Sequence, residues 1–238
     1  MSISGGPVDR ATLEDLAAAS RILADQGVFD AAGHVSMRHP GHPERFLMSR
    51  SLAPQMITAD DIMEFDLDCN AIDARGRNGF IERYLHGEIF RARPDVMAVA
   101  HSHSPSVIAF GLSNTPMRAM YHNAAFLAAG VPVFDIREKF GTTDIVINTP
   151  AKGAALAEVL ADKAVALLRA HGMVAVAPSL PVAVFRAIFT VTSANIQHQA
   201  LALGGPLAAL DAEEGRIADL VNVQTVGRAW DLWKQRVT

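Results

Sequence analysis

Two histidines spaced two residues apart could hold a metal ion. His101 and His103 follow the apolar run 96–100, which is typical of a buried strand. Because residues two apart on a strand point to the same face, both imidazoles could bind one divalent ion. A third histidine, His171, follows a helical pattern at 151–169 and precedes a second apolar run at 173–177. Three imidazoles without a cysteine suit zinc or manganese and leave coordination positions open for substrate.

One carboxylate could transfer protons beside such an ion. Glu82 opens a helix expected at 82–90. A glutamate in a first helical turn is often only a solvated surface residue, because that position favours negative charge. A lone histidine beside an apolar run is likewise more often structural than ligating. The paired spacing therefore carries the metal prediction, and position alone does not make Glu82 catalytic.

Helix and strand patterns alternate around these residues. Thr12-Leu13-Glu14-Asp15 resembles a capping box and predicts a helix to about Gln26. An apolar helix is predicted from Pro181 to about Leu203, with Ser179 as its cap. Strands are predicted near residues 35–38, 46–49, 62–66 and 96–101. The mixture indicates an α/β fold.

Composition and charge restrict the class of protein. With 238 residues, 50% of them hydrophobic, and no linker, the chain is expected to form one domain, 1–238, with a C-terminal tail from about 205. Trp230 and Trp233 are expected to dock this tail, which would close a site or seal an interface. The net charge of -4 and scattered basic residues disfavour nucleic-acid binding.

Cellular location is also predicted from the sequence. Cys69 is the only cysteine, which excludes an intrachain disulfide and is compatible with a reducing compartment. The N-terminus lacks the apolar core of a signal peptide, and no segment approaches a membrane span. We therefore expect a cytoplasmic protein without a membrane partner.

The sequence resembles the class II aldolase/adducin family. Three blocks of that family are similar to residues 82–86, 93–105 and 168–172, and its early Gly-Asn-x-Ser-x-Arg block is similar to residues 33–38. The likeness runs in order from about residue 12 to residue 203. It is far more specific than any one motif.

The resemblance implies both a fold and a ligand set. The expected fold is a single α/β/α layered domain around a mostly antiparallel sheet, assembled as a fourfold homotetramer with sites near subunit contacts. One divalent ion per chain would be held by His101, His103 and His171, with Glu82 at the position of the family's acid/base carboxylate. Zinc or manganese is expected first, with cobalt, iron or magnesium as alternatives.

Three departures from the family pattern bear on the substrate. Phosphosugar aldolases of the family carry Asn in the early block, a Thr-Gly element after the second strand, and Ser-Ser before the catalytic Glu. The corresponding residues here are His34, Ser49-Arg50-Ser51 and Phe80-Ile81. An imidazole, a guanidinium and bulky apolar side chains do not resemble a phosphate cradle. A phosphosugar is therefore not the expected substrate.

These residues suit a flat, carboxylated molecule instead. Arg50 could bind a carboxylate through two parallel hydrogen bonds, and Phe80 could form an apolar wall. His34, Ser49 and His122 complete the predicted substrate contacts, with His122 able to act from a neighbouring subunit. The structural alternatives are a surface ion pair for Arg50, core packing for Phe80 and no role for His122.

The sequence therefore predicts a carbon–carbon lyase. The blocks around His34 and Arg50 resemble the family's metal-dependent decarboxylases, which act on hydroxylated aromatic or heteroaromatic dicarboxylates such as dihydroxyphthalate and hydroxymethylpyridine dicarboxylate. In the expected chemistry, the metal stabilises the enolate left when carbon dioxide departs, and Glu82 moves a proton. The alternatives are an aldolase of a non-phosphorylated hydroxy-oxo acid or sugar and a non-catalytic, adducin-like interaction module.

Overall fold

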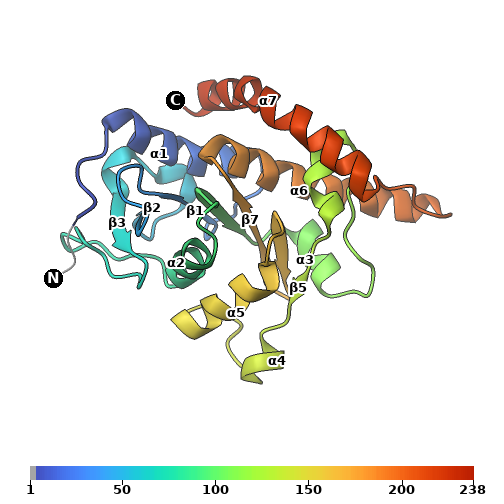
Figure 1. Ribbon diagram of the computed structural model, residues 1–238, viewed down its shortest axis with the longest axis horizontal. Helices are drawn as coiled ribbons and strands as arrows, with labels where there is room; N and C mark the ends of the chain where they lie inside the picture. Colours follow the sequence, from blue (N-terminus) through green and yellow to red (C-terminus); the bar gives the residue numbers. More distant parts are fainter. Residues whose placement is uncertain (1–3) are drawn as a thin grey trace.

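A seven-stranded sheet forms the centre of the computed structural model, which describes residues 4–238 (Figure 1). The strand order is β3-β2-β1-β4-β7-β6-β5. The strands are β1 (His34–Arg38), β2 (Arg45–Ser49), β3 (Ile62–Asp66), β4 (Ala98–Ser102), β5 (Val133–Phe134), β6 (Val165–Leu168) and β7 (Gly172–Ala177). Every neighbouring pair is antiparallel except β5 and β6, which are parallel. The prediction of a mostly antiparallel sheet is confirmed.

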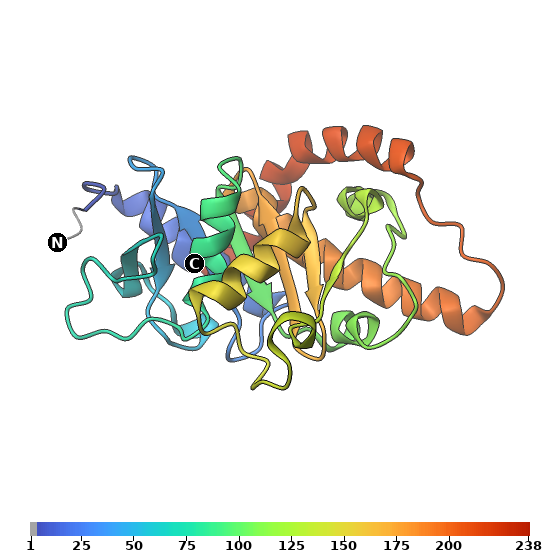
Figure 2. The same cartoon turned by 60° about the horizontal axis from the view of Figure 1, so that its bottom comes forward.

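Helices cover both faces of this sheet. They are α1 (Arg10–Asp25), α2 (Arg83–Ala92), α3 (Pro105–Gly111), α4 (Arg137–Phe140), α5 (Pro150–Leu160), α6 (Leu180–Leu203) and α7 (Ala212–Val237), with 3-10 segments η1 (Pro54–Met56), η2 (Ala59–Asp61) and η3 (His122–Ala129). Helices α2 and α5 pack together on one face, while α1, α3 and α6 pack on the other. Helix α7 contacts α1, α6 and η3 on the outside (Figure 2).

Alternating side chains of the central strands pack into two separate hydrophobic cores, one on each face of the sheet. In β4, Ala98 and Ala100 pack beneath α1 and α6, whereas Val99 packs beneath α2 and α5. Strand β7 alternates in the same way, with Ala175 on the first side and Val174 on the second. Because both faces are buried, these strands appear in the sequence as continuous apolar runs. The predicted α/β/α layering is confirmed.

Two predicted helix boundaries are wrong. Helix α1 begins at Arg10 with Asp9 as its N-cap, and the Asp9 carboxylate accepts a hydrogen bond from the Thr12 backbone N–H at 2.8 Å. The predicted helix at 151–169 ends at Leu160, and 165–168 form strand β6. A short apolar strand that is buried on both faces has no hydrophobic period that distinguishes it from a buried helix. The sequence pattern alone therefore could not show that residues 165–168 form a strand.

The predicted cap of α6 and the predicted docking of the C-terminal tail can both be compared with the structure. Helix α6 has Ser179 as its N-cap, as predicted. Trp230 and Trp233 are buried, and they dock α7 on the core formed with α1 and α6.

The expectation of one domain spanning 1–238 stays a prediction. No helix among residues 4–238 is long and apolar enough to cross a membrane.

Candidate metal centre

Three histidines meet where β4 and β7 lie side by side. His101 lies in β4 opposite Val174 of β7, and His103 follows just after β4 ends. His171 occupies the turn between β6 and β7, not the helix-to-strand junction expected from the sequence. A Cβ at Gly172 would lie 1.9 Å from the Ser102 backbone oxygen, so only glycine allows this turn to approach β4 so closely.

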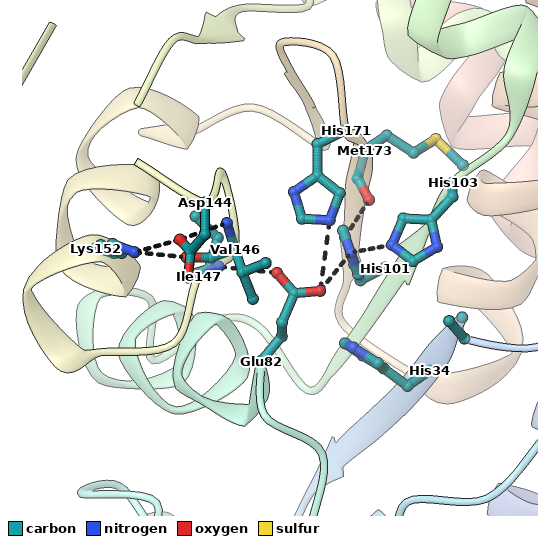
Figure 3. A network of polar contacts seen from close by, with 12 residues as sticks. His34, Glu82, His101, His103, Asp144, Val146, Ile147, Lys152, His171 and Met173 are labelled. Carbon is teal, nitrogen blue, oxygen red and sulfur yellow. Dashed lines mark hydrogen bonds and ion pairs between the residues drawn. The ribbon is translucent and has the colours of Figure 1, made fainter. Parts of the chain in front are cut away.

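The ligand atoms of these histidines converge with Glu82 (Figure 3). The Nε2 atoms of His101 and His103 are 3.1 Å apart. The Glu82 Oε2 atom lies 3.4 Å from the Nε2 atoms of both His101 and His171. One ligand atom from each of the four residues lies within 4.8 Å of every other. The structure thus brings together the four residues that the sequence analysis chose.

The hydrogen bonds behind two of the imidazoles fix where their protons lie. His101 Nδ1 donates to the Met173 backbone oxygen at 3.0 Å, and His103 Nδ1 donates to the Asp30 carboxylate at 3.2 Å. Since these partners only accept, each neutral ring carries its proton on Nδ1 and a lone pair on Nε2. Burial lowers the pKa of His103, which favours this neutral form.

Facing lone pairs require a positive charge between them. Two unprotonated Nε2 atoms 3.1 Å apart cannot hydrogen-bond to each other, and the Glu82 oxygen beside them is a third acceptor. Ligands arranged tetrahedrally at 2.0–2.1 Å from zinc would lie about 3.3 Å from one another. Three of the spacings, at 3.1 and 3.4 Å, are close to that value, and all lie within 4.8 Å, so the residues fit a divalent metal.

His171 differs from the other two histidines. Its Nδ1 atom is buried and has no hydrogen-bond partner among residues 4–238. Metal-binding histidines usually donate this second N–H to an acceptor. No such group within the described chain contacts the Nδ1 of His171, whose ring stacks on His103 at 5.1 Å between ring centres.

Glu82 is held with one oxygen free for chemistry. It is the N-cap residue of α2, and its Oε1 accepts a hydrogen bond from the Ile147 backbone N–H at 2.9 Å. Its Oε2 points to the histidines (Figure 3). Burial raises the pKa of Glu82, but the neighbouring imidazoles of His101 and His171 lower it below its usual range. Glu82 is therefore a carboxylate, placed to serve as a fourth ligand or as a base.

A pocket of about 540 Å³ opens beside this carboxylate. It is lined by Ala31, Ala32, His34, Ser51, Leu52, Ala53, Asn78, Gly79, Phe80, Ile81, Glu82 and His103. The Phe80 ring lies 4.7 Å from the His34 ring, and His34 lies 5.0 Å from His101. Two of the predicted substrate contacts, His34 and Phe80, thus lie in the pocket that contains Glu82.

The other predicted substrate contacts lie outside the pocket lining. Arg50 is 42% exposed, and its Nε donates to Asp61 Oδ1 at 2.6 Å, although its neighbour Ser51 lines the pocket. Ser49 is buried in β2, and His122 is exposed at the start of η3 beside Asn123. The structure does not bring Ser49 or His122 to the pocket of the same chain. Their roles stay predictions.

Sequence reasoning missed the residues that support this site from behind. Asp30 orients His103, and fully buried His86 lies between His34 and Ser36. The His86 Nε2 atom is 2.8 Å from His34 Nδ1, and its Nδ1 is 2.6 Å from Ser36 Oγ. One signal was available: His86 stands one helical turn after Glu82, and Ser36 stands two residues after His34 on the same strand face.

Asp30 gives a first test of the metal centre. Replacing it by asparagine keeps the shape but removes the charge that fixes the His103 tautomer. Loss of such a supporting group typically weakens metal binding by about 10- to 100-fold. Chelator competition should show this weakening for Asp30→Asn and no change for Asp25→Asn, at an exposed residue whose carboxylate accepts a hydrogen bond from its neighbour Gln26. Equal metal affinities in both variants would contradict a role for Asp30.

Comparison with known proteins identifies the family of the chain. The model of the Class II Aldolase and Adducin N-terminal domain matches residues 14–198. The chain belongs to this family. It is 34% identical to decarboxylase tropJ of Talaromyces stipitatus, over 91% of this chain and 90% of that protein. It is 32% identical to the 3,4-dihydroxyphthalate decarboxylase of Arthrobacter keyseri, over 91% and 90% of the two chains.

A solved structure shows the same fold. The L-fuculose 1-phosphate aldolase from Glaciozyma antarctica PI12 superposes with a TM-score of 0.78, over 98% of this chain and 94% of that one, at 23% identity. The chain is thus similar in sequence to proteins named as decarboxylases and similar in fold to a protein named as an aldolase.

Proposed function

We propose that this protein is a metal-dependent decarboxylase of hydroxylated aromatic or heteroaromatic carboxylic acids. The observation that carries the proposal is the position of Glu82, which clusters with three convergent imidazoles and lines the same pocket as His34 and Phe80. The relatives named as decarboxylases, one of them for 3,4-dihydroxyphthalate, support the same reaction class. Phe80 in place of a small hydroxyl residue supports a flat ring as substrate.

The proposed proton movements use Glu82 twice. A divalent ion held by His101, His103 and His171 would supply a Lewis acid beside the substrate oxygens. Glu82 Oε2 accepts the proton of the ring hydroxyl and then gives it to the ring carbon that bears the carboxylate. The bond from this carbon to the carboxylate then breaks, carbon dioxide leaves, and the electron pair restores the ring as a phenolate. The phenolate takes a proton from solvent.

The ring is held by residues of the pocket wall. Phe80 is mostly buried and presents its apolar ring beside His34, so it can pack against a planar substrate. His34 can donate a hydrogen bond to a substrate oxygen, and the pocket volume of about 540 Å³ is ample for one substituted aromatic ring.

An assay of carbon dioxide release tests the proposal. The metal-loaded protein would be incubated with hydroxylated phthalates and pyridine dicarboxylates, and we expect one carbon dioxide per ring product for at least one class. Pyruvate or an aldehyde as product would instead favour aldol cleavage of a hydroxy-oxo acid. Absence of both turnover and bound metal would favour an interaction module.

Arg50 tests whether a substrate carboxylate is bound at the pocket edge. Only its Nε is engaged by Asp61, and its two terminal nitrogens have no partner among the described residues. If they bind a carboxylate as a bidentate pair, Arg50→Lys should raise KM by about tenfold, because lysine offers a point charge and not a fork.

A cycle of protein and substrate changes isolates this contact. Removing the contacted carboxylate from the substrate should weaken binding to the original protein much more than to Arg50→Ala. Strict additivity, with folding and metal content unchanged, would mean that Arg50 does not touch the substrate. Arg45→Lys, at the opposite end of β2 and away from the pocket lining, serves as the control.

Assembly as a homotetramer also stays part of the proposal. His122 does not line the pocket of its own chain, so it could contact substrate only from a second copy. Light scattering would measure the mass in solution, and His122→Ala should alter turnover only if the chains associate.

A further inference from the structure

A chain of three buried polar groups leads from the core to the substrate pocket. His34 and Ser36 lie on the same face of β1, and His86 of α2 bridges them. The bridging distances are 2.8 Å from His86 Nε2 to His34 Nδ1 and 2.6 Å from His86 Nδ1 to Ser36 Oγ. Ser36 and His86 are fully enclosed, whereas His34 lines the pocket.

Only one direction of hydrogen bonding satisfies every group in this chain. Ser36 Oγ has no second hydrogen-bond partner among residues 4–238. If His86 donated to Ser36, the serine hydroxyl proton would be buried without an acceptor, which is costly. If Ser36 donates to His86 Nδ1, then His86 must carry its proton on Nε2 and donate it to His34 Nδ1. All three groups are then paired.

Burial supports the neutral form of His86 that this pattern needs. It lowers the pKa of His86 to about 3, so this ring carries one proton at neutral pH. When that proton lies on Nε2 and is donated to His34 Nδ1, the proton of a neutral His34 ring lies on its Nε2.

We propose that Ser36 and His86 are positioning residues that fix His34 as a hydrogen-bond donor toward the pocket through its Nε2–H. His34 Nε2 has no partner among the described residues, and it is the only ring nitrogen left to face the pocket. The inference rests on the proposed function for the identity of the substrate, but not for the direction of the hydrogen bonds.

The fixed donor defines the chemistry that the pocket accepts at this point. A neutral N–H recognises a carboxylate, phenolate or carbonyl oxygen and rejects an amino or N–H group placed there, which would leave two donors facing each other. We therefore expect His34 to contact an acceptor oxygen on the ring. An analogue with an amino group at that ring position should bind poorly.

Nitrogen NMR tests the direction of the hydrogen bonds without any substrate. In protein with ¹⁵N-labelled histidine and loaded with zinc, His34 and His86 should both appear as the Nε2–H tautomer, with signals assigned by their loss in His34→Gln and His86→Gln. A His34 ring protonated on Nδ1 would overturn the inference. The tautomer measured by NMR does not depend on whether any substrate is decarboxylated.

Kinetics then test whether the donor matters for catalysis. His86→Phe removes the donor at similar volume and should lower kcat/KM by about 10- to 100-fold, mainly through KM. Without that donor, the proton of His34 can move to Nδ1, so that Nε2 no longer presents a donor to the pocket. His86→Gln can still donate through its amide and should recover most of this loss. The exposed His198, which contacts the Ser106 backbone, provides the control His198→Phe with unchanged kinetics.

Two results would reject the positioning role. One is equal kcat/KM in His86→Phe and the original protein when both fold, as checked by circular dichroism. The other is equal damage in His86→Phe and His86→Gln together with an unchanged His34 tautomer, which would indicate packing alone. If His86→Phe does not fold, Ser36→Ala serves instead, with mixed His34 tautomers as the expected outcome.

Discussion

Replacement of His101 or His103 by alanine is expected to remove the metal ion and the activity together. Each ring contributes an Nε2 lone pair aimed at the centre, and each has its proton held on Nδ1 by Met173 or Asp30. Two remaining imidazoles would not hold the ion in the geometry that catalysis needs. We expect turnover to fall by about a thousandfold or more, which corresponds to loss of a Lewis acid worth several kcal/mol.

Metal content measured by elemental analysis gives the direct readout. We expect about one divalent ion per chain in the original protein, as for a single site with three histidine ligands, and little in either variant. His198→Ala, at an exposed histidine that is not part of this ligand set, should keep both metal and activity. Because His101 is fully buried, circular dichroism must show that its variant folds. A double variant, His101→Ala with His103→Ala, that retained full metal occupancy would contradict the assignment.

The histidine pair could be predicted because its information is local. His101 and His103 lie two residues apart at the end of one strand, and a strand fixes the direction of alternate side chains without help from the rest of the fold. His171 joined them because it stands just before a second apolar run, although the expected helix before it is strand β6. Its position depends on Gly172 packing against β4, a contact between residues distant in sequence.

The supporting groups could not be predicted because they come from distant segments. Asp30 reaches His103, and the Ile147 backbone reaches Glu82, only after the sheet has formed. The Arg50–Asp61 pair likewise depends on how β2 meets η2. A carboxylate or backbone amide without a local pattern gives no sequence signal. The sequence therefore predicted the ligands of the candidate site but not the residues that support them.

Glu82→Gln is expected to keep the metal but to lower turnover by about a hundredfold or more, the usual effect of removing a positioned proton-transfer group. The glutamine carbonyl oxygen can still accept the hydrogen bond from the Ile147 N–H, so the side chain should stay in place. Its amide nitrogen would then occupy the position of Oε2 and could not accept a proton. The three imidazoles would remain available to hold the ion.

A second glutamate on the same helix makes this test specific. Glu88 is also mostly buried in α2, but it pairs with Arg91 at 3.5 Å and lies outside the pocket lining. Glu88→Gln should therefore leave turnover nearly unchanged, which separates the loss of a particular proton acceptor from the loss of any buried charge in this helix. Metal content, KM and kcat would be measured for both variants. A Glu82→Gln protein that keeps its metal and an unchanged kcat would show that Glu82 transfers no proton, because the only group then removed is the carboxylate oxygen that faces the imidazoles.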